Sequence, residues 1–206
     1  MLFRRLAETW ASALAQAAGE EDAYRRDLAR YVFETFLSGA LSLVFIVAAS
    51  LLFRVFRTAL LITATIAVLK SIAGGLHMST PLRCAVTGAF TVVVLSYLAL
   101  WFPWSRYSAF FRLVFLIAIN VIVWRKAPLE TKRKPLTPSH KYNLAVLSRV
   151  LVFSASFFCL LFPKVRGMNE LFYSLLFQGI NLLEVTAIGV GKLDHIMGYV
   201  EKNPVF

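Results

Sequence analysis

The stretch K-S-I-A-G-G-L-H-M-S-T-P-L-R-C, from Lys70 to Cys84, is a polar break between two long apolar runs. Its paired glycines predict the end of the preceding helix, because glycine readily adopts the left-handed conformation that closes many helices. Pro81 favours the first turn of a new helix, with Thr80 or Ser79 as its N-cap. The stretch therefore predicts two helices joined by a short polar hinge.

The composition places these helices in a membrane. Hydrophobic residues make up 59% of the 206 residues and charged residues only 16%, against about 45 to 50% and about 25% in soluble domains. The apolar runs are also too long and too numerous for one soluble domain of this length. We therefore expect an all-α integral membrane protein with a single membrane domain over residues 23–206.

About six transmembrane helices are expected in that domain. An amphipathic helix over residues 1–22 is expected to lie at the membrane interface before the first span and to remain in the mature protein, since it lacks the apolar core of a signal peptide. The second apolar run is short for a bilayer, so the hinge after it is expected to lie slightly below the head groups. The six expected spans are 31–53, 56–72, 81–101, 107–124, 144–162 and 169–190.

The basic residues give the expected orientation. With six spans, sixteen Lys and Arg residues fall on the side of both termini and the hinge, and six fall on the other side. By the positive-inside rule the larger group is cytoplasmic, which places the hinge and both termini in the cytoplasm. The net charge of +11 is accordingly expected to meet anionic lipid head groups, and no nucleic-acid partner is expected.

The hinge carries the strongest chemical signal in the chain. Cys84 is expected in the first turn of the helix that follows, where the helix dipole and Arg83 favour the thiolate, and His77 can act as its base. The alternative is that His77 is an interfacial polar residue and Cys84 fills space in a helix. No acidic residue lies between Glu34 and Glu130, so an orienting group must come from a distant span, from Ser79 or Thr80, or from a backbone carbonyl.

Three polar residues in the sixth expected span form a second candidate site. Gln178, Asn181 and Glu184 recur every three residues and are expected on one helical face, and ionisable groups inside a span are often functional. Glu184 is a candidate to orient His77 or to line a substrate groove, and helix packing is the alternative. The same stripe also motivates a different function, that of a membrane transporter or channel.

The remaining cysteine and histidine residues offer little further chemistry. Cys159 lies inside an apolar run and is expected to be a small core residue, so no disulfide framework is expected. A zinc site built from His77, His140 and Cys84 is conceivable, but His140 is more simply read as flanking the fifth span. We expect neither a metal nor another cofactor.

The loop A-P-L-E-T-K-R-K-P-L, from Ala127 to Leu136, lies between two expected spans. Together with the Gly-Gly-x-His hinge and the cysteine seven residues after its histidine, this loop resembles the accessory gene regulator B family of membrane peptidases. The resemblance implies a cysteine endopeptidase of the bacterial cytoplasmic membrane, with Cys84 as nucleophile and His77 as the catalytic histidine. It implies cleavage of a short propeptide through an enzyme thioester, followed by cyclisation to a thiolactone or lactone signal for quorum sensing.

Other residues are assigned supporting roles on this basis. Backbone amides from Leu82 to Cys84 are expected to stabilise an oxyanion, and Lys70 and Arg83 to hold thiolate charge or a substrate carboxylate, unless they are only cytoplasmic anchoring charges. The resemblance also implies an acidic C-terminal segment in the propeptide, for which the basic loop is a docking candidate if its charges do more than set topology. Expected partners are the propeptide and membrane lipid. A homodimer is also compatible with the chain, because lipid-facing surfaces readily associate. Candidate substrate-binding residues are Lys132, Arg133, Lys134, Gln178 and Asn181; candidate supporting residues are Lys70, Ser79, Thr80, Arg83 and Glu184.

Overall fold

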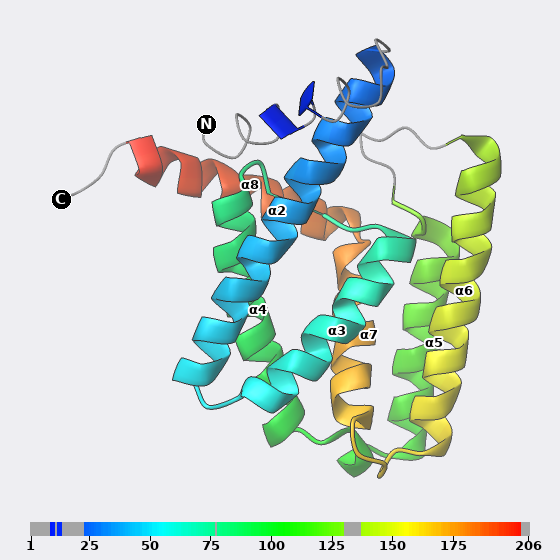
Figure 1. The fold of residues 1–206 in the computed structure, drawn as a ribbon. Coiled ribbons are helices and arrows are strands. Elements are labelled where there is room, and N and C mark those ends of the chain that lie inside the picture. The colour runs from blue at the N-terminus through cyan, green and yellow to red at the C-terminus, as the bar shows by residue number, and fades with distance from the viewer. Residues whose placement is uncertain (1–8, 11, 14–22, 77, 130–136, 203–206) are drawn as a thin grey trace.

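A computed structural model describes residues 9–10, 12–13, 23–76, 78–129 and 137–202. Within these residues every regular element is a helix, which confirms the all-α expectation (Figure 1). The chain order is α2 (Ala23–Leu52), α3 (Phe56–Ala73), α4 (Pro81–Trp101), the short 3₁₀ helix η1 (Trp104–Arg106), α5 (Ala109–Lys126), α6 (Pro138–Leu161), α7 (Met168–Asn181) and α8 (Glu184–Lys202). Most of the expected interfacial helix at 1–22 lies outside the described residues.

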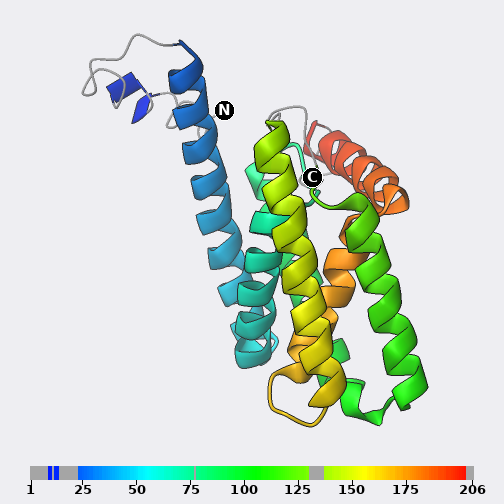
Figure 2. The same ribbon diagram turned by 90° about the vertical axis from the view of Figure 1, so that its right-hand side faces the viewer.

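Helices α2 to α7 run up and down in a bundle, and α8 lies across one of its ends (Figures 1 and 2). We call this end the hinge end, because residues 74–76 and 78–80, the start of α4 and the start of α6 all lie there. The opposite turn end holds the connections 53–55, 102–108 and 162–167. Helices α2 to α7 therefore alternate in direction. The connections expected on one side of the membrane lie at the same end of the bundle.

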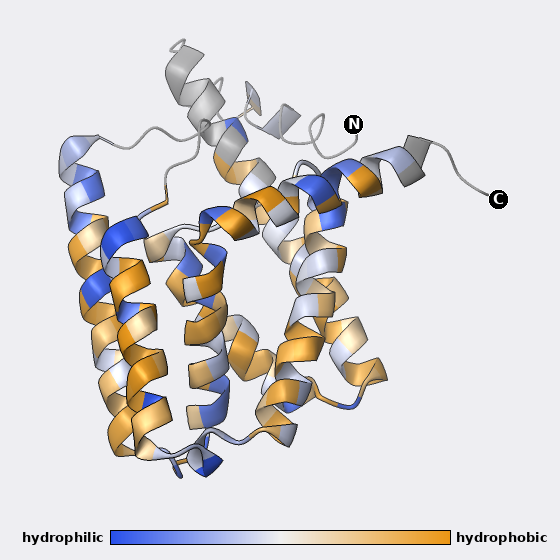
Figure 3. Ribbon diagram, turned by 180° about the vertical axis from the view of Figure 1, so that it is seen from behind, coloured by the Kyte–Doolittle hydropathy of each residue, from blue (hydrophilic) through white to orange (hydrophobic). Residues whose placement is uncertain are grey.

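The outer surface of the bundle is apolar. Large hydrophobic side chains on four different helices are among the most exposed in the protein, including Phe36, Phe90, Phe110 and Phe153, each at least 66% exposed. Figure 3 shows that hydrophobic residues predominate along the helices of the bundle. Water does not favour such a surface, whereas lipid tails do. The protein is a multi-pass membrane protein.

Four helices are each long and apolar enough to cross a bilayer: the 35–52 part of α2, then α3, α4 and α6. Helix α5 has the same length as α3 but carries Arg112, Arg125 and Lys126 near its ends. The sixth expected span, 169–190, is wrong as a single helix, because α7 ends at Asn181 and α8 starts at Glu184 with a bend of 83° between them. The bend brings the charged side chain of Glu184 to the surface, where it is solvated and paired.

Helix α7 is the centre of the bundle. It packs against α3, α4, α5 and α6, and half of its residues are buried. At the turn end its Phe172 ring stacks on Trp104, with ring centroids 3.7 Å apart. The sequence W-F-P-W at 101–104 has the composition of an interfacial anchor. Trp101 and Phe102 are exposed, at 66% and 52%, whereas Trp104 is fully buried in the core. These contacts fix α7 along its length, so that its last turn has a defined position at the hinge end.

Candidate active site

The first turn of α4 carries Cys84 as expected from the sequence. Pro81 is the first helical residue, and Thr80 is the N-cap, with an extended backbone and a side-chain oxygen that accepts from the Arg83 N–H at 3.4 Å. The Cys84 N–H donates to the Thr80 carbonyl at 3.1 Å. Cys84 is partly buried and is not in a disulfide. The thiol therefore lies at the positive end of the α4 dipole.

The hinge before this turn packs against the loop after α5. Gly74 has a φ of 75°, in the left-handed region that favours glycine, and a Cβ there would lie 2.8 Å from the Leu129 carbonyl oxygen. The Leu129 N–H donates to the Ala73 carbonyl at 3.0 Å. The Gly-Gly hinge and the start of the A-P-L loop, separated by more than 50 residues in the sequence, are thus in direct contact.

The end of α7 supplies the other wall of the hinge. Gln178 Nε2 donates to the Gly74 carbonyl at 2.9 Å, and a Cβ on Gly75 would lie 2.6 Å from Asn181 Nδ2. Gln178 is fully buried and Asn181 is 4% exposed. Nevertheless Gln178 Oε1 and Asn181 Nδ2 make no hydrogen bond among the residues that the structure describes. A buried acceptor and a buried donor are therefore left unused beside the hinge, an arrangement that is costly unless a ligand satisfies it.

Lys70 connects these groups to Cys84. It lies in the last turn of α3, donates to the Leu76 carbonyl at 3.2 Å, and its ammonium is 5.8 Å from the centroid of the Phe177 ring. The side chain also lies beside Gly75, where a Cβ would be 2.9 Å from Lys70 Cε. An electrostatic interaction links the ammonium to Cys84. The thiol thus lies near a basic side chain of α3 as well as at the N-terminus of α4.

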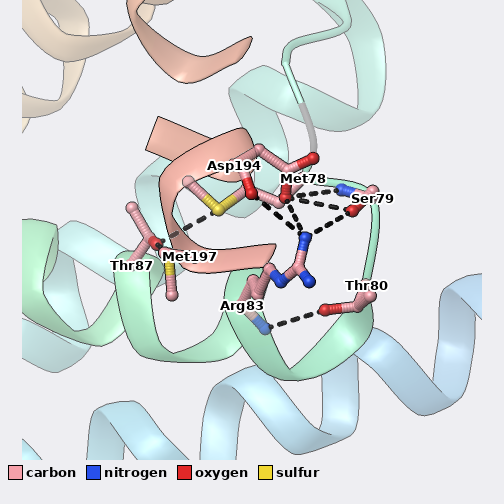
Figure 4. Close-up of polar contacts among 7 residues, drawn as sticks. All are labelled: Met78, Ser79, Thr80, Arg83, Thr87, Asp194 and Met197. Atoms are coloured by element: carbon pink, nitrogen blue, oxygen red, sulfur yellow. Dashed lines mark hydrogen bonds and ion pairs between the residues drawn. The ribbon is translucent and has the colours of Figure 1, made fainter. Parts of the chain in front are cut away.

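Helix α8 contributes a carboxylate that the sequence analysis did not identify (Figure 4). Asp194 Oδ1 accepts from Arg83 at 3.1 Å and from the Ser79 hydroxyl and N–H at 3.0 and 3.3 Å. Partial burial of this carboxylate favours its neutral form, but the hydrogen bonds from Ser79 and Arg83 outweigh burial and hold the pKa of Asp194 below its usual value. Arg83 itself was the available signal, since an Arg at the start of an apolar helix calls for a counter-ion.

Glu184 does not join this site. Its side chain is 82% exposed and pairs with Lys126 at the end of α5, a contact that lowers the pKa of Glu184. The expected face of Gln178, Asn181 and Glu184 is therefore wrong: the chain turns after Asn181, so the first two residues point into the bundle and the third lies on its surface. The roles suggested for Glu184 beside His77 or in a substrate groove lose their basis.

The other candidates divide into placed and undescribed residues. His140 lies exposed in the first turn of α6, consistent with flanking that helix, and Cys159 is fully buried in the core, as expected. Asn120 bonds Ser156 across the α5–α6 interface at 2.8 Å. His77 and the basic residues Lys132, Arg133 and Lys134 lie outside the described residues, and their assigned roles stay predictions.

Comparisons with known proteins agree with this geometry. The family model described as accessory gene regulator B matches residues 7–182. The chain is 23% identical to Protein FsrB of Enterococcus faecalis over 171 residues, covering 81% of this chain and 68% of that protein. It is 26% identical to accessory gene regulator protein B of Staphylococcus intermedius over 142 residues, covering 68% of this chain and 72% of the relative. No solved structure matches. Because the family model covers most of the chain, the protein belongs to the accessory gene regulator B family.

Proposed function

We propose that this protein is a membrane cysteine endopeptidase that cleaves a short propeptide and helps to cyclise the retained part. Its family is linked to the maturation of quorum-sensing autoinducer peptides, and this link supports the choice of substrate. The observation that carries the proposal is the surroundings of Cys84: a helix N-terminus, the Lys70 ammonium, and the unused polar atoms of Gln178 and Asn181. A thiol at a helix N-terminus, near a basic side chain and near buried polar atoms without described partners, suits attack on a peptide bond.

In the proposed reaction, His77 removes the proton from Cys84, and the sulfur attacks the carbonyl carbon of the scissile peptide. The C–N bond breaks, the proton passes from His77 to the leaving amine, and the C-terminal fragment departs. The remaining peptide is then joined to Cys84 as a thioester. A thiol or hydroxyl of the same peptide attacks this thioester, which closes the ring and returns the proton to the Cys84 sulfur.

A side-chain donor is available for the oxyanion in addition to the backbone amides expected from the sequence. Of the backbone amides expected to serve, those of Arg83 and Cys84 already donate to Thr80. Asn181 Nδ2 is a buried donor with no partner among the described residues. We therefore assign Asn181, with the positive charge of Lys70, to the substrate carbonyl, and Gln178 Oε1 to an N–H of the substrate backbone.

The proposed location is the bacterial cytoplasmic membrane, with both termini and the hinge in the cytoplasm. The hinge, the loop after α5 and α8 lie at one end of the bundle (Figure 1), and most of the basic residues belong to this end. The positive-inside rule makes this end cytoplasmic. The propeptide therefore meets Cys84 before export, and Lys132, Arg133 and Lys134 remain the proposed dock for an acidic segment.

Co-expression in bacterial membranes tests the proposal. The full chain is paired with a candidate propeptide, and the wild type is compared with Cys84→Ser, His77→Ala and the control Cys159→Ala. We expect cleavage products, and a thioester adduct at Cys84 detected by mass spectrometry, in the wild type and in the control only. Full processing by Cys84→Ser or by His77→Ala would contradict the proposed chemistry.

The transporter alternative is not supported by the site. Its motive was a stripe of three polar residues along one membrane helix, and the bend after Asn181 removes Glu184 from that stripe. The two remaining members lie against the hinge near Cys84. Their position favours a role in the peptidase reaction.

A further inference from the structure

Helix α8 lies beyond residues 7–182, the range that the family model matches. It nevertheless packs onto the turn that carries Cys84. We propose that Asp194 of α8 is a positioning residue, which fixes the first turn of α4 and thereby the Cys84 sulfur. This inference rests on the proposed function, because the position of the sulfur matters only if Cys84 is the nucleophile.

Asp194 holds the turn on both sides of its N-cap. Before Thr80 it accepts two hydrogen bonds from Ser79, and after Thr80 it accepts one from the guanidinium of Arg83. The guanidinium also donates to the Asp194 backbone carbonyl at 3.1 Å and to the Ser79 hydroxyl at 3.1 Å. Five bonds therefore join three residues. The bond from the Ser79 N–H ties Asp194 to the backbone that leads into the turn, and the bonds from Arg83 tie it to the residue directly before Cys84.

The ion pair is shielded from water. The side chains of Arg83 and Asp194 are only 14% and 22% exposed, so their attraction is screened less than that of a surface pair. The neighbouring turn of α8 fits the same surface: a Cβ on Gly198 would lie 3.1 Å from an Arg83 nitrogen. The Thr87 hydroxyl lies 3.3 Å from Met78 Sδ and 3.9 Å from Met197 Sδ. The contact thus extends along more than one turn of α8.

Helix α8 can hold this position because its two faces differ. Val185, Ile188, Ile196 and Tyr199 are each at least 58% exposed and lie on the face opposite to Asp194, at 100° per residue. A helix with an apolar outer face at the end of a membrane bundle is suited to the lipid interface. Helix α8 therefore connects the lipid surface on one side with the Cys84 turn on the other.

The test uses the full chain in membranes with the variants Asp194→Ala, Asp194→Asn and Asp194→Glu. The matched control is His195→Ala, which alters the exposed neighbour on the same helix. Amide hydrogen exchange over residues 79–84 reports the turn without any substrate. We expect faster exchange in Asp194→Ala, because the Ser79 N–H loses its acceptor, and unchanged exchange in His195→Ala.

The second readout is cleavage of the propeptide that the wild type processes. We expect kcat to fall about tenfold in Asp194→Ala with little change in KM, because a small displacement of a reacting atom slows the chemical step more than it weakens binding. Asp194→Asn keeps an acceptor for Ser79 and should lose less, and Asp194→Glu, which keeps the charge, should lose least. A purely structural role would lower the amount of folded protein without producing this series in kcat.

Two outcomes overturn the inference. One is unchanged exchange over residues 79–84 in Asp194→Ala, which shows that α8 does not hold the turn. The other is normal kcat in Asp194→Ala while Cys84→Ser is inactive, which shows that the turn needs no positioning. If instead Cys84→Ser cleaves normally, the proposed function fails, and the positioning role of Asp194 in the reaction fails with it. The exchange result still reports the contact itself in that case.

Discussion

The turn around Trp104 and the hinge before Cys84 are built in opposite ways. Trp104 is fully buried and stacks on Phe172. Its ring N–H donates to the Cys159 carbonyl at 2.9 Å, and its backbone N–H donates to Asn169 Oδ1 at 2.9 Å. At the hinge, by contrast, the buried amides of Gln178 and Asn181 keep atoms without a partner among the described residues. At the Trp104 turn the polar atoms of this residue are hydrogen-bonded within the packed core. At the hinge, buried polar atoms of Gln178 and Asn181 have no described partner.

Each region also contains one of the two cysteines. Cys159 is fully buried among apolar side chains, where its thiol behaves as a small hydrophobic group. Cys84 is partly exposed at a helix N-terminus beside Lys70. The difference teaches that the Trp104 turn contributes stability, whereas the hinge keeps buried polar atoms that lower stability unless a ligand or reaction uses them.

The two cysteines provide the sharpest test of this comparison. Cys84→Ser should reduce cleavage by about a thousandfold or more, because the serine hydroxyl is a far weaker nucleophile than a thiolate. Cys159→Ala should leave cleavage intact and lower thermal stability, since it removes a buried side-chain atom. Propeptide cleavage followed by mass spectrometry, with thermal unfolding in detergent, measures both. Equal loss of cleavage in the two variants would break the comparison.

The buried Asn181 and the partly buried Asn120 together test whether the unused atoms serve function. Asn181→Leu should lower cleavage by about a hundredfold, the order of effect seen when an oxyanion donor is removed. It should leave thermal stability unchanged or raised, because the variant replaces an unpaired buried donor with an apolar group of similar shape. Asn120→Leu is the matched control at a satisfied site: it breaks the bond to Ser156 and should cost about 1 to 3 kcal/mol of stability while sparing cleavage.

Substitution of two glycines with positive φ, Gly74 at the hinge end and Gly167 at the turn end, tests how each backbone region affects cleavage. Gly74→Ala places a Cβ 2.8 Å from the Leu129 carbonyl, whereas Gly167→Ala at the turn end meets nothing within 4 Å. Both variants carry the cost of a left-handed alanine, about 1 to 2 kcal/mol. Only Gly74→Ala should also separate the hinge from the A-P-L loop and slow cleavage, by about tenfold for a displaced site. Similar cleavage rates in the two variants would show that this contact does not position the site.

The sequence was sufficient for the local features of the hinge. Pro81 and the paired glycines set the start of α4 and the end of α3, because each residue restricts or frees its own backbone. The apolar runs similarly located the helices of the bundle. These features depend on neighbours within a turn or two of the chain.

The contacts with α8 could not be obtained in the same way. The largely apolar sequence of residues 169–190 predicts one helix and not the bend after Asn181, which depends on the packing of α7 and on the exposure of Glu184. The pairing of Arg83 with Asp194 spans more than 100 residues and follows from that bend. Because α7 ends at Asn181, the carboxylate that reaches the hinge is Asp194 of α8. Helical periodicity in the sequence favours Glu184 instead.

Glu184→Gln measures the smallest expected effect. The carboxylate is 82% exposed and pairs with Lys126, whose side chain is 42% exposed, and exposed pairs contribute about 0 to 1 kcal/mol. Cleavage should therefore change by less than about twofold, in contrast to the loss expected for Asp194→Ala on the same helix. Glu184→Gln and Asp194→Asn each replace an acidic residue of α8 by its amide, so a comparison of kcat for these two variants in the same membranes separates contact with the Cys84 turn from general charge on α8. A large loss in Glu184→Gln would instead mean that α8 acts through its start, where α7 ends beside Gln178 and Asn181.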